Sequence, residues 1–279
     1  MALKSEQSRI GVFDSGVGGL SVLRAIRQQL PAQPVIFLAD QAHVPYGSRD
    51  LEEVRSFSEA ITRFLIDCGA RLIVVACNTA SAAALYSLRS TFPEVPFVGM
   101  EPAVKPAAEK TASGVVGVLA TPATFQGALY ASVVDRFAQG VKILQDTCPG
   151  LVSEIEAGNL QGSSTRSILE KALKPMLAQG IDTVVLACTH YPFVIPLIQE
   201  IVGPEVRVID PAPAIARQTA RQLEAHAWTT HVSQPGFIRM FTSGQPQKFT
   251  DLLPFMLGEK LVAQQVLWEN GRLIGAGEF

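Results

Sequence analysis

The sequence predicts an α/β fold with two pseudo-symmetric α/β domains, each built on a mainly parallel central sheet, and an active site in the cleft between them. Short apolar runs rich in Val and Ile alternate with amphipathic stretches, and small polar residues follow each run. Landmarks of the first part of the chain also recur roughly a hundred residues later. Near-continuous apolar strands that alternate with helices are typical of parallel sheets covered on both faces.

The apolar runs mark the predicted strands. In chain order they are Ile10–Phe13, Val35–Leu38, Leu72–Ala76, Phe97–Gly99, Val115–Leu119, Thr183–Ala187 and Val206–Ile209. Between them, Glu52–Cys68 and Ser164–Gln179 carry the amphipathic pattern of helices. After the last of these strands the sequence predicts a helix over Pro213–His226, a strand over Phe237–Phe241 and a helical tail.

An internal repeat organises these elements into two units. Four landmarks recur in the same order: Ile10–Phe13 as Val116–Leu119, Ala39–Asp40 as Gln145–Asp146, Val74–Thr79 as Val185–His190, and Met100–Ala103 as Ile209–Ala212. Near-constant spacing of this kind is typical of a duplicated α/β unit. The residues after Ile209 do not continue the second copy, so we expect them to pack on the first. This predicts a discontinuous first domain, 1–99 and 210–279, and a second domain, 100–209.

Composition and charge exclude several classes of protein. The chain has 279 residues, enough for two domains, and 48% of them are hydrophobic, as in a compact globular enzyme. The net charge is −2 without a Lys/Arg cluster, so we expect no nucleic-acid partner. The apolar runs are too short to span a membrane, and the polar start of the chain does not resemble a signal segment. A cytoplasmic protein with free thiols is therefore expected.

Two cysteines carry the strongest functional signal. Cys77 and Cys188 occupy equivalent points of the repeat, each directly after an apolar strand and ahead of a predicted helix start. A thiol there lies near helix N-terminal amides, which lower its pKa and can also hold a substrate carboxylate. A single cysteine of this kind is often only a small buried hydrophobe. Two at equivalent positions, both flanked by polar residues, favour catalysis.

A symmetric pair of thiols suits the inversion of a stereocentre. One base removes a proton from one face of a carbon atom, and an acid delivers a proton to the opposite face. The two groups then exchange roles in the reverse direction. A thiol hydrolase instead needs one cysteine with a basic histidine and has no use for a second equivalent thiol.

Three further residues are candidates to assist the thiols. Asp14 ends the first strand on the side of the first thiol, although it could equally cap the helix that begins near Gly18. His190 lies two residues after Cys188, and Glu156 lies in the intervening stretch. The alternatives are an ordinary loop histidine and a surface carboxylate.

Other motifs give weaker signals. The run Gly16–Ser21 departs from G-x-G-x-x-G at Ser21, so its glycines more plausibly tighten the turn or admit a small anionic ligand than bind NAD. Pro45–Gly47 predicts a tight loop that lines a pocket. Cys68 is expected in the core and Cys148 in a turn. The remaining histidines form no ligand-spaced cluster, so no metal site is expected: His43, His226 and His231.

Six motifs that occur in a fixed order along the chain are together specific for one protein family. They are Ile10–Leu20, Val44–Gly47, Val75–Ser81, Gly99–Pro106, Leu186–Pro192 and Phe241–Gly244. The chain strongly resembles glutamate racemase, of the aspartate/glutamate racemase superfamily, from about Arg9 to its end.

The resemblance implies a cofactor-independent isomerase, a homodimer, that interconverts L- and D-glutamate and supplies D-glutamate for peptidoglycan, and hence for cell-wall biogenesis and cell shape. It implies that Cys77 deprotonates D-glutamate with support from Asp14, and that Cys188 deprotonates L-glutamate. Glu156 and His190 would support Cys188, with Glu154 as the competitor of Glu156. The implied substrate-binding residues are Asp14, Ser15, Pro45, Tyr46, Gly47, Asn78, Thr79, Thr121, Thr124, Thr189 and His190.

Three alternatives remain open. A racemase of the same superfamily could act on aspartate or another amino acid, because the sequence does not reveal the size of the pocket. A decarboxylase or isomerase on this fold could lack one thiol or its helpers, and both are present here. A non-catalytic amino-acid-binding protein would bind one enantiomer without exchanging its α-proton.

Overall fold

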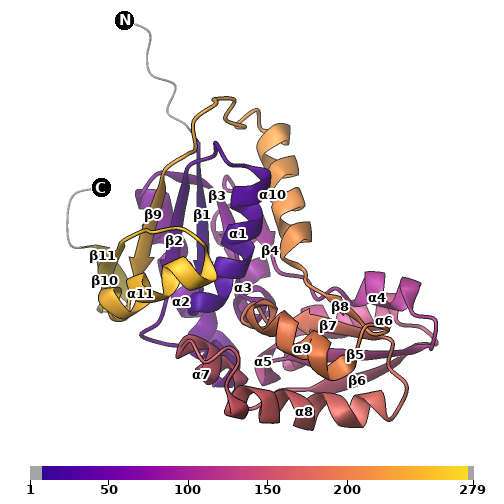
Figure 1. Ribbon diagram of the computed structural model, residues 1–279. Coiled ribbons are helices and arrows are strands. Elements are labelled where there is room, and N and C mark those ends of the chain that lie inside the picture. The colour runs from indigo at the N-terminus through magenta and orange to yellow at the C-terminus, as the bar shows by residue number, and fades with distance from the viewer. Residues whose placement is uncertain (1–7, 276–279) are drawn as a thin grey trace, which may run out of the picture.

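The computed structural model describes residues 8–275 and contains two β-sheets flanked by helices (Figure 1). The larger sheet has the strand order β11-β10-β9-β2-β1-β3-β4 and the smaller one β6-β5-β7-β8. The strands of the larger sheet are β1 (Arg9–Asp14), β2 (Val35–Ala39), β3 (Ala70–Val75), β4 (Phe97–Gly99), β9 (Ile238–Thr242), β10 (Ala263–Glu269) and β11 (Arg272–Gly275). Those of the smaller sheet are β5 (Val115–Ala120), β6 (Lys142–Asp146), β7 (Thr183–Ala187) and β8 (Arg207–Ile209).

The two sheets repeat one topology, which confirms the predicted pseudo-symmetric α/β fold. The order β2-β1-β3-β4 in the larger sheet recurs as β6-β5-β7-β8 in the smaller one. The register recurs as well: Gly11 pairs with Ile73 in the first unit, and Gly117 pairs with Val184 in the second. Within the described chain every strand pair is parallel except β10 with β11.

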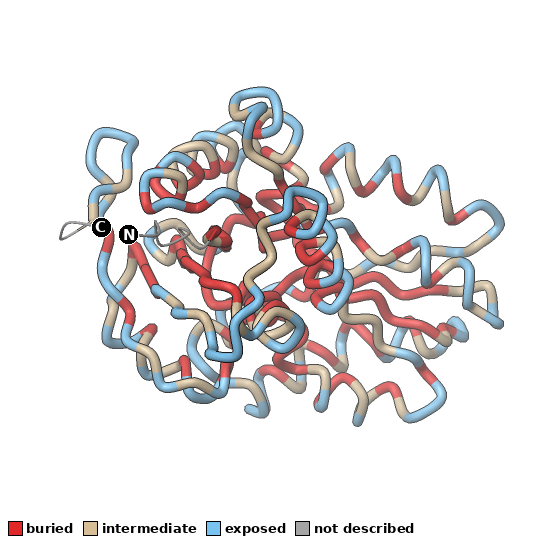
Figure 2. The backbone as a smooth tube through the Cα atoms, turned by 90° about the horizontal axis from the view of Figure 1, so that it is seen from above, coloured by how far each residue is buried: buried red, intermediate tan, exposed pale blue. Residues whose placement is uncertain are grey.

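Helices cover both faces of each sheet. On the larger sheet α1 (Leu20–Gln29) and α10 (Ala212–Ala225) pack together on one face, and α2 (Leu51–Asp67) and α3 (Asn78–Thr91) on the other. On the smaller sheet one face is covered by α8 (Ser163–Leu177) and α9 (Ile195–Val202), and the other by α4 (Val104–Lys110) and α6 (Ala128–Phe137). The strands are buried between these layers (Figure 2).

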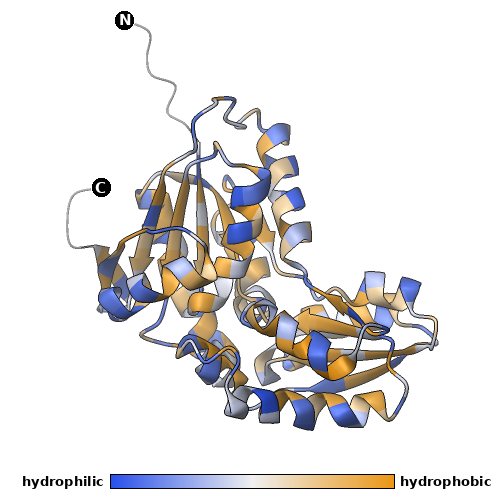
Figure 3. Cartoon of the chain, viewed as in Figure 1, coloured by the Kyte–Doolittle hydropathy of each residue, from blue (hydrophilic) through white to orange (hydrophobic). Residues whose placement is uncertain are grey.

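One apolar core continues from the first unit into the second. It contains Ile10 and Val12 of the larger sheet together with Leu119 and Leu186 of the smaller one. Fully burying each such side chain contributes about 1.5–3 kcal/mol to folding. Hydrophobic residues accordingly fill the strands, while hydrophilic residues lie on the outer surfaces of the helices (Figure 3). The shared core fixes the carboxyl ends of both sheets relative to each other.

The predicted helical tail is wrong in its second half. Helix α11 (Pro246–Met256) forms, but the chain then continues as the antiparallel hairpin of β10 and β11, which extends the larger sheet. Asn270 and Gly271 form the hairpin turn with positive φ angles of 49° and 74°. Asn-Gly is a strong hairpin signal in sequence, because both residues tolerate that backbone conformation.

Strand β6 was also absent from the predicted set, although its last residue belongs to a landmark of the repeat. Lys142 and Gln145 interrupt its apolar run and are exposed, as expected for an edge strand.

Strand β4 ends at Gly99 in the larger sheet and β8 ends at Ile209 in the smaller one. The domain boundaries themselves stay a prediction. Residues 1–7, with the predicted polar start, and residues 276–279 of the predicted tail lie outside the described part of the chain.

No helix between residues 8 and 275 is both long and apolar enough to cross a membrane.

Candidate active site

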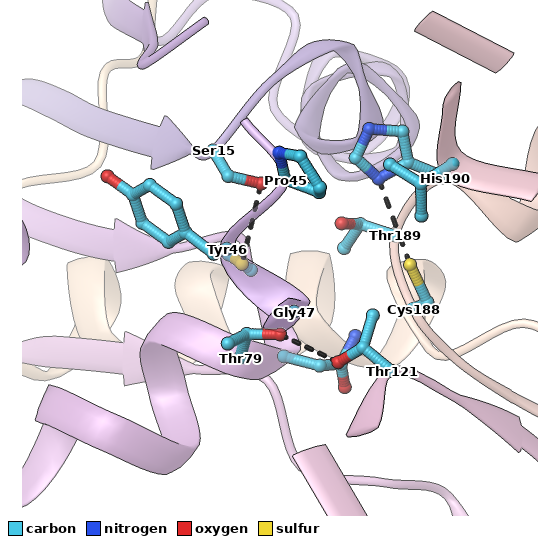
Figure 4. Close-up of a pocket in the computed structure, with 12 residues that line it drawn as sticks. Ser15, Pro45, Tyr46, Gly47, Thr79, Thr121, Cys188, Thr189 and His190 are labelled. Atoms are coloured by element: carbon cyan, nitrogen blue, oxygen red, sulfur yellow. Dashed lines mark hydrogen bonds between the residues drawn. The ribbon is translucent and has the colours of Figure 1, made fainter. Parts of the chain in front are cut away.

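A small pocket lies where the two units meet (Figure 4). Residues after the carboxyl ends of β1, β3 and β7 line it, as expected for a ligand site in an α/β fold. The lining residues are Ser15, Pro45, Tyr46, Gly47, Cys77, Asn78, Thr79, Thr121, Val152, Cys188, Thr189 and His190. The pocket is small, which favours a ligand of a few carbon atoms.

Cys77 caps the N-terminus of α3. Its sulfur accepts a hydrogen bond from the Ala80 amide at 3.4 Å, and its thiol faces the Ser15 hydroxyl at 3.9 Å. Burial and the nearby Asp14 carboxylate raise the pKa of the Cys77 thiol well above its usual value, although the Ala80 amide acts in the opposite direction. The expectation that helix amides favour the thiolate is therefore wrong for this cysteine, because desolvation outweighs them.

Cys188 follows β7, but no α-helix begins directly after it. A 3-10 turn, η3 (Tyr191–Val194), comes first, and α9 begins at Ile195. Pro196 explains the delay, because a proline ring clashes with the carbonyl four residues earlier in an α-helix. Instead of helix amides, the Cys188 sulfur has the Nδ1 atom of His190 at 3.8 Å.

His190 and Glu156 form an ion pair behind Cys188. The Nε2 atom of His190 lies 2.6 Å from the Oε1 atom of Glu156. Burial alone would lower the pKa of His190, but its contacts with Cys188 and Glu156 raise that pKa well above the usual value. Burial likewise opposes ionisation of Glu156, and the hydrogen bond from His190 outweighs it and lowers the pKa of Glu156. The sulfur of Cys188 therefore faces an imidazolium.

Glu154 does not reach this pair. Its carboxylate accepts hydrogen bonds from Asn159 and Ser164 at the surface of the molecule. Of the two glutamates that the sequence left open, the structure brings Glu156 to His190.

Asp14 is fully buried, and the structure shows it in a capping role, while its support of Cys77 stays a prediction. Its Oδ2 atom accepts a hydrogen bond from the Gly19 amide at 2.6 Å, so it caps the turn before α1. Its other oxygen faces the Thr189 hydroxyl at 3.5 Å. Burial raises the pKa of Asp14 to about 6, against the opposing effect of His190, and Cys77 is also a hydrogen-bond partner. Asp14 can therefore exchange a proton near neutral pH.

The glycine run Gly16–Ser21 contacts the ion pair of His190 and Glu156. A Cβ atom on Gly16 would lie 1.9 Å from the Oε1 atom of Glu156, and one on Gly18 would lie 2.4 Å from the Nδ1 atom of His190. The missing side chains allow the backbone to approach the carboxylate of Glu156, and a small anionic ligand at these glycines stays a prediction.

The polar wall of the pocket contains a hydroxyl cluster and an unpaired amide. Thr79 from the first unit and Thr121 from the second lie 2.9 Å apart, and Thr124 completes the cluster. Asn78 is 3% exposed, yet neither polar atom of its side chain has a hydrogen-bond partner among residues 8–275. A buried amide without partners costs about 1–3 kcal/mol, which a polar ligand would recover.

Comparison with known proteins identifies the family of this site. Residues 10–219 match the model of the Asp/Glu/hydantoin racemase family. A glutamate racemase of Pseudomonas aeruginosa is 51% identical over 253 residues, 91% of this chain and 95% of that protein. The chain belongs to this racemase family. It is an isomerase, as the strong likeness to racemases over nearly the whole chain shows.

Solved structures agree with this assignment and with the two-domain fold of the racemase. Glutamate racemase isoform RacE1 from Bacillus anthracis superposes with a TM-score of 0.86 at 31% identity, covering 96% of this chain and 99% of that one. A glutamate racemase from Francisella tularensis, solved in complex with D-glutamate, gives a TM-score of 0.82 at 27% identity and covers 94% of this chain and 98% of that one.

Most sequence-predicted site residues of the racemase come together in this pocket. Asp14, Thr124 and Glu156 lie behind the lining rather than in it. Val152 of α7 (Leu151–Glu156) is the lining residue that the sequence analysis missed, because an apolar residue in a short helix carries no signal of its own. Cys68 and Cys148 are buried outside the lining. Residues 8–275 contain no cluster of three His, Cys, Asp or Glu side chains that could hold a metal ion.

A buried carboxylate anchors the loop that carries Tyr46. Asp40 accepts hydrogen bonds from Tyr46 at 2.6 Å, Ser243 at 2.6 Å, Trp268 at 2.7 Å and His43 at 2.9 Å. Burial would raise the pKa of Asp40, but these donors outweigh it and hold the pKa below its usual value. The loop of Pro45, Tyr46 and Gly47 is thereby tied to β9 and β10.

Replacing Asp40 with asparagine should destabilise the racemase by about 2–3 kcal/mol at pH 7, because an amide cannot accept all four hydrogen bonds. The folded pKa of Asp40 is lowered, so its contribution is present above the unfolded pKa and is lost as the pH falls through the folded value. The difference from the wild type should therefore shrink in acid. Urea unfolding at several pH values measures it, with the exposed Asp135→Asn as control. A difference that is constant with pH contradicts this account.

Proposed function

We propose that this racemase interconverts L- and D-glutamate by moving the α-proton between Cys77 and Cys188. The observation that carries the proposal is the pair of buried thiols at equivalent ends of two pseudo-symmetric sheets, both lining one small pocket. The named activity of the relatives supports glutamate as the substrate.

The two thiols are prepared for opposite roles. Cys188 faces the imidazolium of His190, so in the L-to-D direction its thiolate takes the α-proton and the Cα–H bond breaks. Cys77, whose raised pKa keeps it protonated, gives its proton to the opposite face, where the new Cα–H bond forms. The enzyme is then left with a thiol at Cys188 and a thiolate at Cys77. The D-to-L direction runs the same steps in reverse.

Asp14 helps Cys77 to exist as a thiolate during this cycle. A carboxylate beside a thiolate is unfavourable, since like charges repel. With a pKa of about 6, Asp14 can take up a proton when Cys77 becomes a thiolate and release it when Cys77 is protonated again. His190 and Glu156 provide the corresponding support for Cys188 through their ion pair.

The polar wall orients the substrate between the thiols. The unpaired amide of Asn78 offers one donor group and one acceptor for the polar groups of an amino acid. The backbone amides at the start of the 14-residue helix α3 favour a carboxylate nearby. The hydroxyls of Ser15, Thr79 and Thr189 complete the set.

Incubating the protein with L-glutamate in D2O, without added cofactor, tests the proposal. We expect deuterium at the α-carbon by NMR together with a decay of optical rotation toward zero. Reaction of L-aspartate in place of glutamate would keep the two-thiol chemistry and replace the substrate. Absence of exchange with every amino acid tried would reject catalysis in favour of a binding protein.

Three implications of the resemblance stay predictions: the homodimer, the cytoplasmic location and the supply of D-glutamate to peptidoglycan. Light scattering of the purified protein measures the first.

A further inference from the structure

Glu156 receives hydrogen bonds from the opposite unit as well as from His190. Glu156 is the last residue of α7, which lies along the chain between strands β6 and β7 of the smaller sheet. Its Oε1 atom accepts from the Val17 amide at 2.7 Å, and its Oε2 atom accepts from the Gln41 side chain at 3.0 Å. Val17 follows β1 and Gln41 follows β2, both strands of the larger sheet. The carboxylate therefore closes a contact between the two units directly behind Cys188.

Gln41 is itself held in one orientation. The hydroxyl of Thr242, at the end of β9, donates to the Oε1 atom of Gln41 at 2.9 Å and accepts from the Gly244 amide at 3.0 Å. An ionised carboxylate only accepts hydrogen bonds, so the amide nitrogen of Gln41 must face Glu156. A continuous chain of contacts thus leads from β9 through Gln41 and Glu156 to His190.

We propose that Gln41 is a positioning residue, which holds the Glu156 carboxylate against His190 from across the junction of the two units. Gln41 is not part of the pocket lining and does not reach the sulfur of Cys188, so it acts only through Glu156. The effect of Gln41 on catalysis rests on the proposed function, whereas its effect on the pKa of His190 does not.

The charges around the ion pair give the direction of the effect. The titratable groups that face His190 are Glu156 from α7, Asp14 from β1 and the neighbouring Cys188, and those that face Glu156 are His190 and Asp14. The hydrogen bond from Gln41 helps to lower the pKa of Glu156. Without that bond the carboxylate is less firmly held at His190, and the pKa of His190 should fall. Protonated His190 should then be lost at a lower pH than in the wild type.

Gln41→Leu tests the proposal, because leucine has a similar size and no donor. We expect the NMR titration of His190, assigned with a His190→Gln variant, to move to lower pH. We expect kcat/KM for L-glutamate to fall about three- to tenfold, with the basic limb of its pH profile shifted in the same direction. Gln265→Leu is the matched control: this exposed glutamine bonds the Gly244 carbonyl at 3.1 Å and not Glu156. Urea unfolding of both variants checks that the fold is intact.

Two results would overturn the proposal. One is an unchanged titration of His190 in Gln41→Leu. The other is a loss of activity of equal size at every pH, which a merely structural role would produce. If the wild type does not racemise glutamate, the proposed function fails, but the titration of His190 still decides the role of Gln41.

Discussion

Serine in place of either pocket cysteine should lower kcat for glutamate racemisation about a thousandfold, since positioned general acid–base groups contribute about 10²–10⁴. A hydroxyl is a far weaker acid than a thiol, so it neither ionises beside His190 nor gives up its proton readily in place of Cys77. L- and D-glutamate have equal free energies, so kcat/KM must fall by the same factor in both directions. Polarimetry from each enantiomer measures both values.

Proton exchange distinguishes the faces of the substrate. In Cys77→Ser the thiolate of Cys188 still removes the α-proton of L-glutamate and can return deuterium to the same face. L-glutamate should therefore exchange in D2O faster than it racemises, and in Cys188→Ser the same should hold for D-glutamate. NMR and chiral chromatography on the same samples compare the two rates.

Cys68→Ser provides the control for this experiment. Cys68 is buried in the core next to α2, away from the pocket, and burial raises the pKa of its thiol to about 12. Its variant should keep the activity of the wild type. Racemisation within tenfold of the wild type in Cys77→Ser or Cys188→Ser would contradict the two-thiol mechanism.

The repeat and the thiols were readable from sequence because they are local patterns. An apolar strand followed by Ala-Cys and polar residues occurs twice, and the structure places both cysteines at one pocket. The choice of Glu156 over Glu154 depended on spacing alone. Only the fold shows which of these glutamates faces His190.

Other properties of the site depend on contacts between distant segments. The raised pKa of Cys77 comes from its burial and from Asp14 on a different strand, so the helix-amide signal after Cys77 gave the wrong direction. Gln41 carries no sequence signal, because a lone glutamine after a strand matches no catalytic motif. The glycine run was visible, but its partner, the carboxylate of Glu156, lies 140 positions further along the chain than Gly16.

Gly16→Ala should lower kcat/KM about 10- to 100-fold and also lower the free energy of unfolding, because the new methyl group meets the carboxylate of Glu156. A Cβ atom at residue 16 would come within 1.9 Å of the Oε1 atom of Glu156, the mobile end of a long side chain. The carboxylate can move away at little cost in packing. It then loses the hydrogen bonds with the Val17 amide and with His190, and bonds to charged groups contribute about 1.5–3 kcal/mol each. Steady-state kinetics and urea unfolding measure the two effects separately.

Gly162→Ala is the matched control for this substitution. A Cβ atom there meets no atom within 4 Å, and the φ angle of −66° suits alanine. We expect wild-type kinetics from it. In Gly16→Ala the His190 titration should move to lower pH, in the same direction as in Gln41→Leu, because both changes draw Glu156 away from the imidazole. Loss of stability with an unchanged His190 titration would instead mean that Gly16 serves packing alone, since displacement of the Glu156 carboxylate must also shift the titration of His190.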